Sequence, residues 1–174
     1  MAELAWWAET LQNDLTQGDI VSAFPIALLP KPLKYLKKMS TLGQGKTGWL
    51  EVSDPFLDEN DQTYYLAKGR VIQGIIVSHS CDIDKNARRI LVAPIAKIES
   101  LQENHREAVV NQTNIRLMAL PNVPGLGDAY ADLRSITAVP AELIHELKRN
   151  ASMTDQALLL LQTRLIEFFT RKQP

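Results

Sequence analysis

The densest group of reactive side chains in this sequence is the run Ser78-His79-Ser80-Cys81-Asp82-Ile83-Asp84. It combines an imidazole, a thiol and two carboxylates. In nucleophilic catalysis an imidazole takes the proton of the nucleophile, and a carboxylate orients the imidazole. On an extended strand, residues two apart share a face, so His79 and Cys81 would lie together, with Ser80 and Asp82 on the other side. We therefore expect His79, Cys81 and Asp82 to form the functional centre.

A structural interpretation of the same run stays open. Cys81 would then be a small buried hydrophobic residue, and Asp82 and Asp84 would form a turn together with Asn86. His79 and Asp82 would serve only to satisfy backbone groups.

The same side chains make a poor metal site. Clustered ligands of mixed hardness are unusual for zinc, and His105 and His145 each stand alone on a polar segment. Cys81 is the only cysteine, which excludes a multi-cysteine zinc site and an internal disulfide. We expect no metal and no other cofactor.

Two apolar strands must position this centre. The reactive run follows the segment Val71–Ser78, and a second apolar segment spans Arg89–Ile95. Segments this apolar are normally covered on both faces, and their order predicts a central hairpin. Lys68 and Lys97 would lie near the strand ends, so we expect cationic groups to converge on the centre around His79.

A block of lysines between Pro30 and Trp49 contains no acidic residue. Lysines bind phosphate, and the nearby aromatic side chains of Tyr35 and Trp49 can stack on bases, so the block suits single-stranded nucleic acid. A solvated loop explains it equally well. The residues expected to contact nucleic acid are Lys31, Lys34, Lys37, Lys38, Lys46 and Lys68.

The remaining patterns predict an α+β fold. Apolar residues recur at helical spacing over residues 2–15, so a helix should open the chain. Two helices should end it, over 140–150 and 152–171, the second capped by Ser152 with Asp155. Further strands are expected at 20–24, ending at Pro25, and at 63–66, 115–120, 130–133 and 135–139. We expect one domain over residues 1–174, with a barrel-like sheet over 17–139 and the C-terminal helices over 140–172.

Composition excludes several classes of protein. With 174 residues, 45% hydrophobic residues and a net charge of −1, the chain is neither globally disordered nor a strongly basic nucleic-acid-coating protein. The longest apolar runs are far shorter than the ~20 residues of a spanning helix. The N-terminus has no basic region followed by an apolar one, so no secretory signal is visible. These features and the single cysteine indicate a cytoplasmic protein without a membrane segment.

Four short pieces of the sequence resemble the PemK/MazF-like family of ribonuclease toxins, in the order in which the family has them. Gly18-Asp19-Ile20-Val21 resembles the opening Gly-Asp-Ile-Val strand, and Gln73–Ser78 resembles the Arg-Pro-Ala-Leu-Val-Leu-Ser strand. Val92-Ala93-Pro94-Ile95 resembles the Val-Cys-Pro-Ile strand, and Asp132–Ile136 with Pro140–Leu143 resembles the closing strand and helix. The resemblance implies a small SH3-like β-barrel, here with an N-terminal helix and two C-terminal helices.

The family's catalytic positions are altered. Its toxins cut single-stranded RNA without a metal, using an arginine near the second strand and a threonine or serine just after Pro-Ile. Here the hydroxyl position is Ala96 and the arginine position is Ile72, with Arg70 two residues earlier. An active site on this chain would be rearranged, with Lys68, Arg70 or Lys97 stabilising phosphate charge and His79 as general base.

Two functions therefore compete. The first is a module of a toxin or phage-defence type system that binds a protein or a nucleic acid, which the loss of the hydroxyl at Ala96 favours. The alternative is a metal-independent endoribonuclease that cuts single-stranded RNA, with His79, Cys81, Asp82, Arg70 and Lys97 as its catalytic residues. The expected partners are single-stranded RNA or a protein.

The sequence also predicts self-association. Phe168 and Phe169 are consecutive, so both cannot face one narrow helical stripe, and Trp6 and Trp7 pose the same problem. Surplus apolar surface usually marks an interface, so we expect a homodimer.

Overall fold

In a computed structural model of the protein, residues 4–28, 34–37, 48–51, 64–85 and 88–171 are described. They form two compact units, one built from Met1–Phe24 and Ile72–Pro174 and the other from Pro25–Val71. The strands are β1 (Ile20–Leu28), β2 (Lys34–Lys37), β3 (Gly48–Glu51), β4 (Tyr64–Leu66), β5 (Lys68–Ile76), β6 (Arg89–Lys97), β7 (Leu117–Val123), β8 (Gly127–Asp132), β9 (Thr137–Pro140) and β10 (Arg149–Ala151). The helices are α1 (Ser80–Asp84), α2 (Glu103–Val110), α3 (Ala141–Glu146) and α4 (Asp155–Thr170), with short 3₁₀ turns η1 (Ile98–Ser100) and η2 (Leu133–Ser135).

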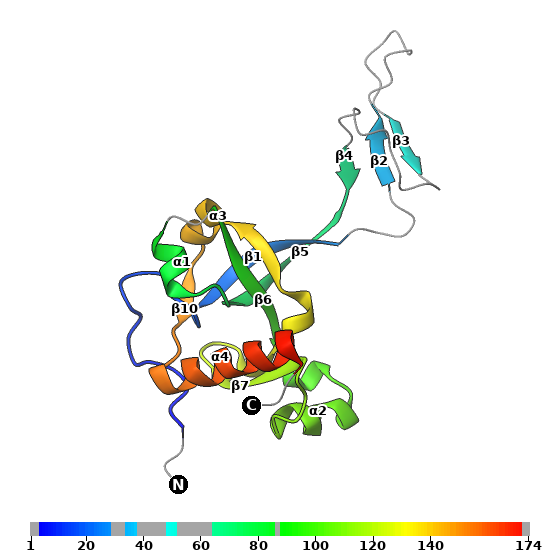
Figure 1. Ribbon diagram of the computed structural model, residues 1–174. Helices are drawn as coiled ribbons and strands as arrows, with labels where there is room; N and C mark the ends of the chain where they lie inside the picture. The colour runs from blue at the N-terminus through cyan, green and yellow to red at the C-terminus, as the bar shows by residue number, and fades with distance from the viewer. Residues whose placement is uncertain (1–3, 29–33, 38–47, 52–63, 86–87, 172–174) are drawn as a thin grey trace. The chain divides into compact units, whose positions relative to one another are not determined.

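The predicted α+β class is confirmed by a seven-stranded antiparallel sheet accompanied by these helices (Figure 1). Its strand order is β10-β1-β5-β6-β8-β7, with β9 pairing the free half of β6. The path is open: within the described residues no pairing joins β7 to β10, so the sheet is not a closed barrel.

The predicted central hairpin is confirmed as the pair β5 and β6. Its register places Gln73 opposite Ile95 and Ile76 opposite Val92. We expected both strands to be covered on both faces. This is wrong at Val71 of β5, which is 68% exposed, and at Leu91 of β6, which is 40% exposed. Gly74 lies in the buried part, where a Cβ atom would come within 2.3 Å of the Phe24 ring and 2.5 Å of Val92. Only glycine fits between these two side chains.

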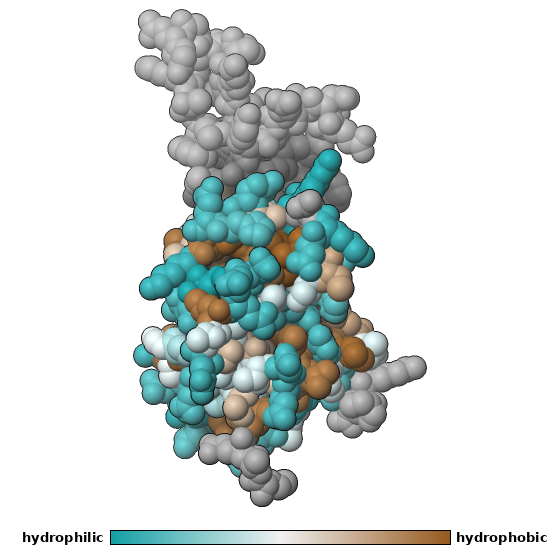
Figure 2. Space-filling model, turned by 90° about the vertical axis from the view of Figure 1, so that its left-hand side faces the viewer, coloured by the Kyte–Doolittle hydropathy of each residue, from teal (hydrophilic) through white to brown (hydrophobic). Residues whose placement is uncertain are grey.

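The main core lies between the sheet and α4, which crosses in front of the sheet in Figure 1. Ala157, Leu161 and Leu165 form the buried stripe of α4. They pack against sheet residues such as Ile75 and Ile95. The apolar pattern that predicted the last helix is therefore the pattern that covers the sheet. On the face shown in Figure 2, hydrophobic surface forms separate patches between hydrophilic residues.

The predicted N-terminal helix is wrong. Residues 4–19 contain no helix; Trp7 forms a β-bridge with Met153, and the Ala8 N–H donates to the Ser152 carbonyl at 2.9 Å. A short isolated helix is marginally stable, so hydrogen bonds to a distant segment and burial of the tryptophans outweigh local helical preference. Trp6 and Trp7 both pack partly buried against the main core.

Two further boundaries differ from the prediction. β1 continues through Pro25 to Leu28. Its partner β10 pairs with it only at Ile20 and Val21. Pro25, which has no N–H, is therefore tolerated, because that side of the strand is unpaired there. α3 ends at Glu146, and Arg149–Ala151 then form β10 rather than a longer helix. The closing strands appear as β8 and β9, as expected.

Ser152 does not cap the last helix, which is a second correction to the C-terminal segment. The N-cap of α4 is Thr154, whose Oγ1 accepts from the Ala157 N–H at 3.3 Å. Ser152 is buried and its hydroxyl donates to a distant carboxylate, described below.

The second unit contains a three-stranded antiparallel sheet of order β3-β2-β4. Its register pairs Leu36 with both Trp49 and Tyr64, and Lys34 with Glu51 and Leu66. Within the described parts of the chain, no helix is both long and apolar enough to span a membrane.

Candidate functional site

The predicted centre around His79 lies at the turn where the chain leaves β5. His79 is the N-cap of α1, with φ −64° and ψ 142°, and its Nδ1 accepts a hydrogen bond from the Cys81 N–H at 3.2 Å. The expectation of an extended strand here is therefore wrong. A side chain that accepts from the second residue of a helix satisfies a backbone donor that has no partner within the helix. Asp82 lies in the first turn, where negative charge favours a helix.

Cys81 does not form the expected pair with the imidazole. Among the contacts of the described residues, none joins the thiol to His79; the ring is used by the Cys81 backbone instead. The alternative that Cys81 is a buried hydrophobic residue is also wrong, because Cys81 is exposed. Asp82 and Asp84 are exposed as well. The turn thus presents an imidazole, a thiol and carboxylates to solvent without a preassembled nucleophile.

The position of this turn is set by two serines and a glutamine. The Ser78 Oγ accepts from the Leu91 N–H of β6 at 2.8 Å, and the Ser80 Oγ accepts from the Gln17 N–H at 3.2 Å. The Gln17 side chain donates to the Val77 carbonyl at 2.8 Å and accepts from Gln162 of α4 at 2.9 Å. The segment before β1 therefore fixes where α1 begins.

A buried polar cluster surrounds Asp19, a residue that the sequence patterns do not single out as a site residue. Asp19 has no exposed surface. Its carboxylate accepts from the Ser152 hydroxyl at 2.6 Å, from Arg149 Nη1 at 3.1 Å, and from the Thr16 N–H and hydroxyl at 2.9 and 3.3 Å. A buried carboxylate needs such partners to offset the loss of hydration.

Arg149 extends the cluster to the N-terminal segment. Its guanidinium donates to the backbone carbonyls of Gln12, Asn13 and Asp14 at 2.6–3.0 Å. The only local signal of this cluster is an acidic residue immediately before a buried strand, and nothing in the sequence points from Asp19 to Arg149. Both carboxylate oxygens of Asp19 and both terminal nitrogens of Arg149 are used internally, so the cluster holds the chain in place.

The antiparallel register separates Lys97 from His79, contrary to our expectation of convergence. Ser78 hydrogen bonds with Leu91 near the start of β6, whereas Lys97 ends the same strand. The six intervening steps of ~3.3 Å span about 20 Å. Lys68 and Arg70 are exposed residues of the other unit. Lys97 and His79 do not form one site in this structure.

Of the remaining predicted lysines, Lys34 and Lys37 are the first and last residues of β2. Lys31, Lys38 and Lys46 lie outside the described residues. Across the ranges that are described, no group of three or more His, Cys, Asp or Glu side chains is arranged to hold a metal ion.

Ile72 and Ala96, the two positions that the resemblance would make catalytic, lie on the neighbouring strands β5 and β6. The last pair of the β5–β6 register joins Gln73 to Ile95, and Ile72 and Ala96 are the next residues of the two strands beyond that pair. Ala96 also pairs with Tyr130 of β8. Cross-strand neighbours on one face have Cβ atoms about 5 Å apart, so polar side chains at these positions would be in reach of one substrate. Both are apolar in this chain.

No protein-family model matches the sequence, and no curated protein matches it.

Proposed function

We propose that this chain is a non-catalytic binding module built on a PemK/MazF-like, SH3-like scaffold, and that its partner is a protein. The scaffold proposal is supported by the order of the resembling pieces along the antiparallel sheet: the Gly18-Asp19 motif precedes β1, the next two pieces form the β5–β6 hairpin, and the last leads into β9 and α3.

The observation that carries the non-catalytic proposal is the pair Ile72 and Ala96. Neither side chain can donate a hydrogen bond, hold a phosphate or transfer a proton. The groups offered for a rearranged ribonuclease site do not compensate, because Lys97 lies about 20 Å along β6 from the strand end that leads to His79. An endoribonuclease would need groups that converge on one phosphate.

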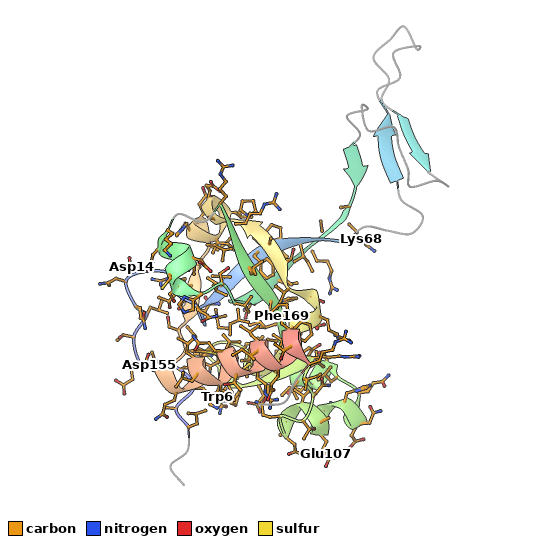
Figure 3. All side chains as sticks on the ribbon, viewed as in Figure 1. Trp6, Asp14, Lys68, Glu107, Asp155 and Phe169 are labelled. Carbon is orange, nitrogen blue, oxygen red and sulfur yellow. The ribbon has the colours of Figure 1, made fainter. Side chains whose placement is uncertain are left out.

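The surface proposed for protein binding is the outer face of α4. Leu159, Ile166 and Phe169 are between 61% and 65% exposed. They fall within an arc of about 80° on an ideal helix. The sequence argument about consecutive phenylalanines is confirmed in one respect: Phe168 packs against the core while Phe169 is exposed, with their rings edge to face at 5.2 Å. Figure 3 labels Phe169 at the end of α4 and Asp155 at its start.

A second copy of the chain suits this face. In an antiparallel pair of α4 helices, the exposed Asp155 at one end would approach the exposed Arg171 of the other copy, so charges of opposite sign would flank the apolar centre. We therefore propose a homodimer through α4.

The direct test of the function is incubation of the protein with mixed single-stranded RNA, with and without a chelator. We expect no cleavage by the wild-type protein at stoichiometric concentration. Metal-independent cleavage that is lost in both His79→Ala and Lys97→Ala variants would replace this proposal by the endoribonuclease alternative. Salt-dependent binding without cleavage would show that nucleic acid is a partner. Co-purification from the native host followed by mass spectrometry tests the protein partner.

A further inference from the structure

Two adjoining cavities lie where the N-terminal segment meets the outer edge of β7. The larger has a volume of about 280 Å³, and the smaller has about 180 Å³. They share Trp6 and Pro121 as walls. The other residues that line the larger cavity are Ile98, Val110, Gln112, Ala119 and Asp128. Neither cavity includes any residue of the turn at His79 or of the α4 face.

The backbone of this β7 edge is already occupied. The Trp7 indole N–H donates to the Pro121 carbonyl at 2.8 Å, and the Gln112 side-chain amide donates to the Ala119 carbonyl at 3.3 Å. Pro121 has no N–H to offer. An added strand would find few free backbone groups here. A ligand must therefore be recognised by the side chains of the cavity.

One polar side chain of the larger cavity, Asp128, offers an accessible hydrogen-bond acceptor. The Oε1 atom of Gln112 also has no hydrogen-bond partner among the described residues, but it is buried and out of reach of a ligand. One carboxylate oxygen of Asp128 accepts from the Asn122 N–H at 2.9 Å, and the other has no partner in the described part of the chain. No described lining residue carries a positive charge. The cavity thus combines an exposed negative charge with an apolar wall.

The walls are held in place by contacts from distant elements. Arg164 of α4 donates to the backbone carbonyl of Gln112, and Gln112 has a left-handed φ of 56°. Asn122, which holds Asp128 and lines the smaller cavity, has a left-handed φ of 51°. Such conformations are costly outside glycine and persist only where the surroundings enforce them.

Trp6 is held by the Thr154 N–H, which donates to the Trp6 carbonyl at 3.1 Å. Figure 3 labels Trp6 on the N-terminal segment.

We propose that the larger cavity binds a small organic cation, an ammonium or guanidinium group attached to an aromatic or branched apolar body. The apolar body would lie against Ile98, Val110 and Pro121, and the cation would bind the exposed carboxylate of Asp128. An indole such as that of Trp6 is the aromatic ring that attracts cations most strongly. The volume lies just below the range of drug-sized sites, so one ring or one branched group fits. The bound cation would belong either to a free amine or to a peptide in which a basic residue stands beside an apolar one. This proposal does not depend on the proposed function.

The test is to add each of the following probes to the full chain and to measure binding by isothermal titration calorimetry and by NMR of the indole N–H signals. The free-amine probe is 2-phenylethylammonium, and 2-phenylethanol is its neutral counterpart. An acetylated tetrapeptide with arginine beside leucine represents the peptide source. We expect at least one of the two cations to bind with a Kd of about 1 mM or tighter, and the neutral counterpart to bind about tenfold more weakly.

Asp128→Asn keeps an oxygen for the Asn122 N–H but removes the charge, and we expect it to weaken cation binding about tenfold. The control is Glu99→Gln, which makes the same change of net charge at an exposed residue outside the cavity and should leave binding unchanged. Binding of the free amine alone identifies a small-molecule site, and binding of the peptide alone identifies a polypeptide ligand. Equal binding of the neutral counterpart, an unaltered Kd in Asp128→Asn, or no binding of either cation at about 10 mM would overturn the proposal.

Discussion

Asp19 and Arg149 are 130 positions apart in the sequence, yet the Nη1 atom of Arg149 donates to the fully buried carboxylate of Asp19 across 3.1 Å. The same guanidinium holds three carbonyls of the N-terminal segment. This pair therefore connects the start of β1, β10 and the N-terminal segment. Its loss should affect the stability of the whole unit rather than one loop.

We predict that Arg149→Met lowers the free energy of unfolding by about 3 kcal/mol, because it leaves a buried carboxylate without its cation. Urea denaturation followed by circular dichroism measures the change. Arg134→Met is the matched control, since Arg134 forms an ion pair with Asp132 at 2.8 Å but its side chain is 53% exposed. That variant should lose less than about 1 kcal/mol. Equal effects of the two substitutions would contradict the role given to the Asp19 cluster.

Gly74→Ala should destabilise the protein by about 1–3 kcal/mol, because the added Cβ overlaps the Phe24 ring and the Val92 methyl group. Gly69→Ala is the control in the same strand, where a Cβ would meet nothing within 4 Å. It should change the free energy of unfolding by less than about 0.5 kcal/mol. Thermal unfolding of both variants measures the difference, and a fully stable Gly74→Ala protein would show that the hairpin packs differently against Phe24.

His79→Ala should cost about 1 kcal/mol of stability through loss of the N-cap of α1, whereas His79→Asn should restore most of it, since asparagine is a good capping residue. Cys81→Ser and Asp82→Asn change exposed side chains and should leave the melting temperature almost unchanged. If His79 also contacts a partner, His79→Asn will be stable but defective in binding. Full binding by the stable His79→Asn, Cys81→Ser and Asp82→Asn variants would reduce this turn to a structural element.

Light scattering at micromolar concentration should give a mass of twice 19.5 kDa for the wild-type chain. Phe169→Asp places a charge in the apolar face of α4 and should give the monomer mass. Leu11→Asp makes the same kind of change at another exposed apolar residue and should leave the dimer intact. A monomeric wild-type protein would exclude the proposed interface.

The elements that could be predicted from the amino-acid sequence are those whose apolar pattern is local and strong. The apolar runs around Ile75 and Val92 predicted the β5–β6 hairpin, and the helical stripe containing Leu161 and Leu165 predicted α4. In both cases the residues that bury apolar surface are also those with the matching periodicity, so local preference and tertiary packing agree. The candidate residues His79, Cys81 and Asp82 can also be recognised in the sequence. They combine reactive side-chain types and follow a strand whose C-terminal end is buried in the core.

The combination of groups that are distant in the sequence depends on the folded arrangement of the strands. The N-terminal segment has a helical pattern, but its hydrogen bonds go to Ser152 and Pro121, because a short helix cannot compete with packing on a formed sheet. Strand direction places Lys97 far from His79, and that direction depends on pairing, which composition does not encode. The pairing of Asp19 with Arg149 exists only after the sheet brings β1 beside β10, since burial of a charge requires partners that the fold itself must deliver.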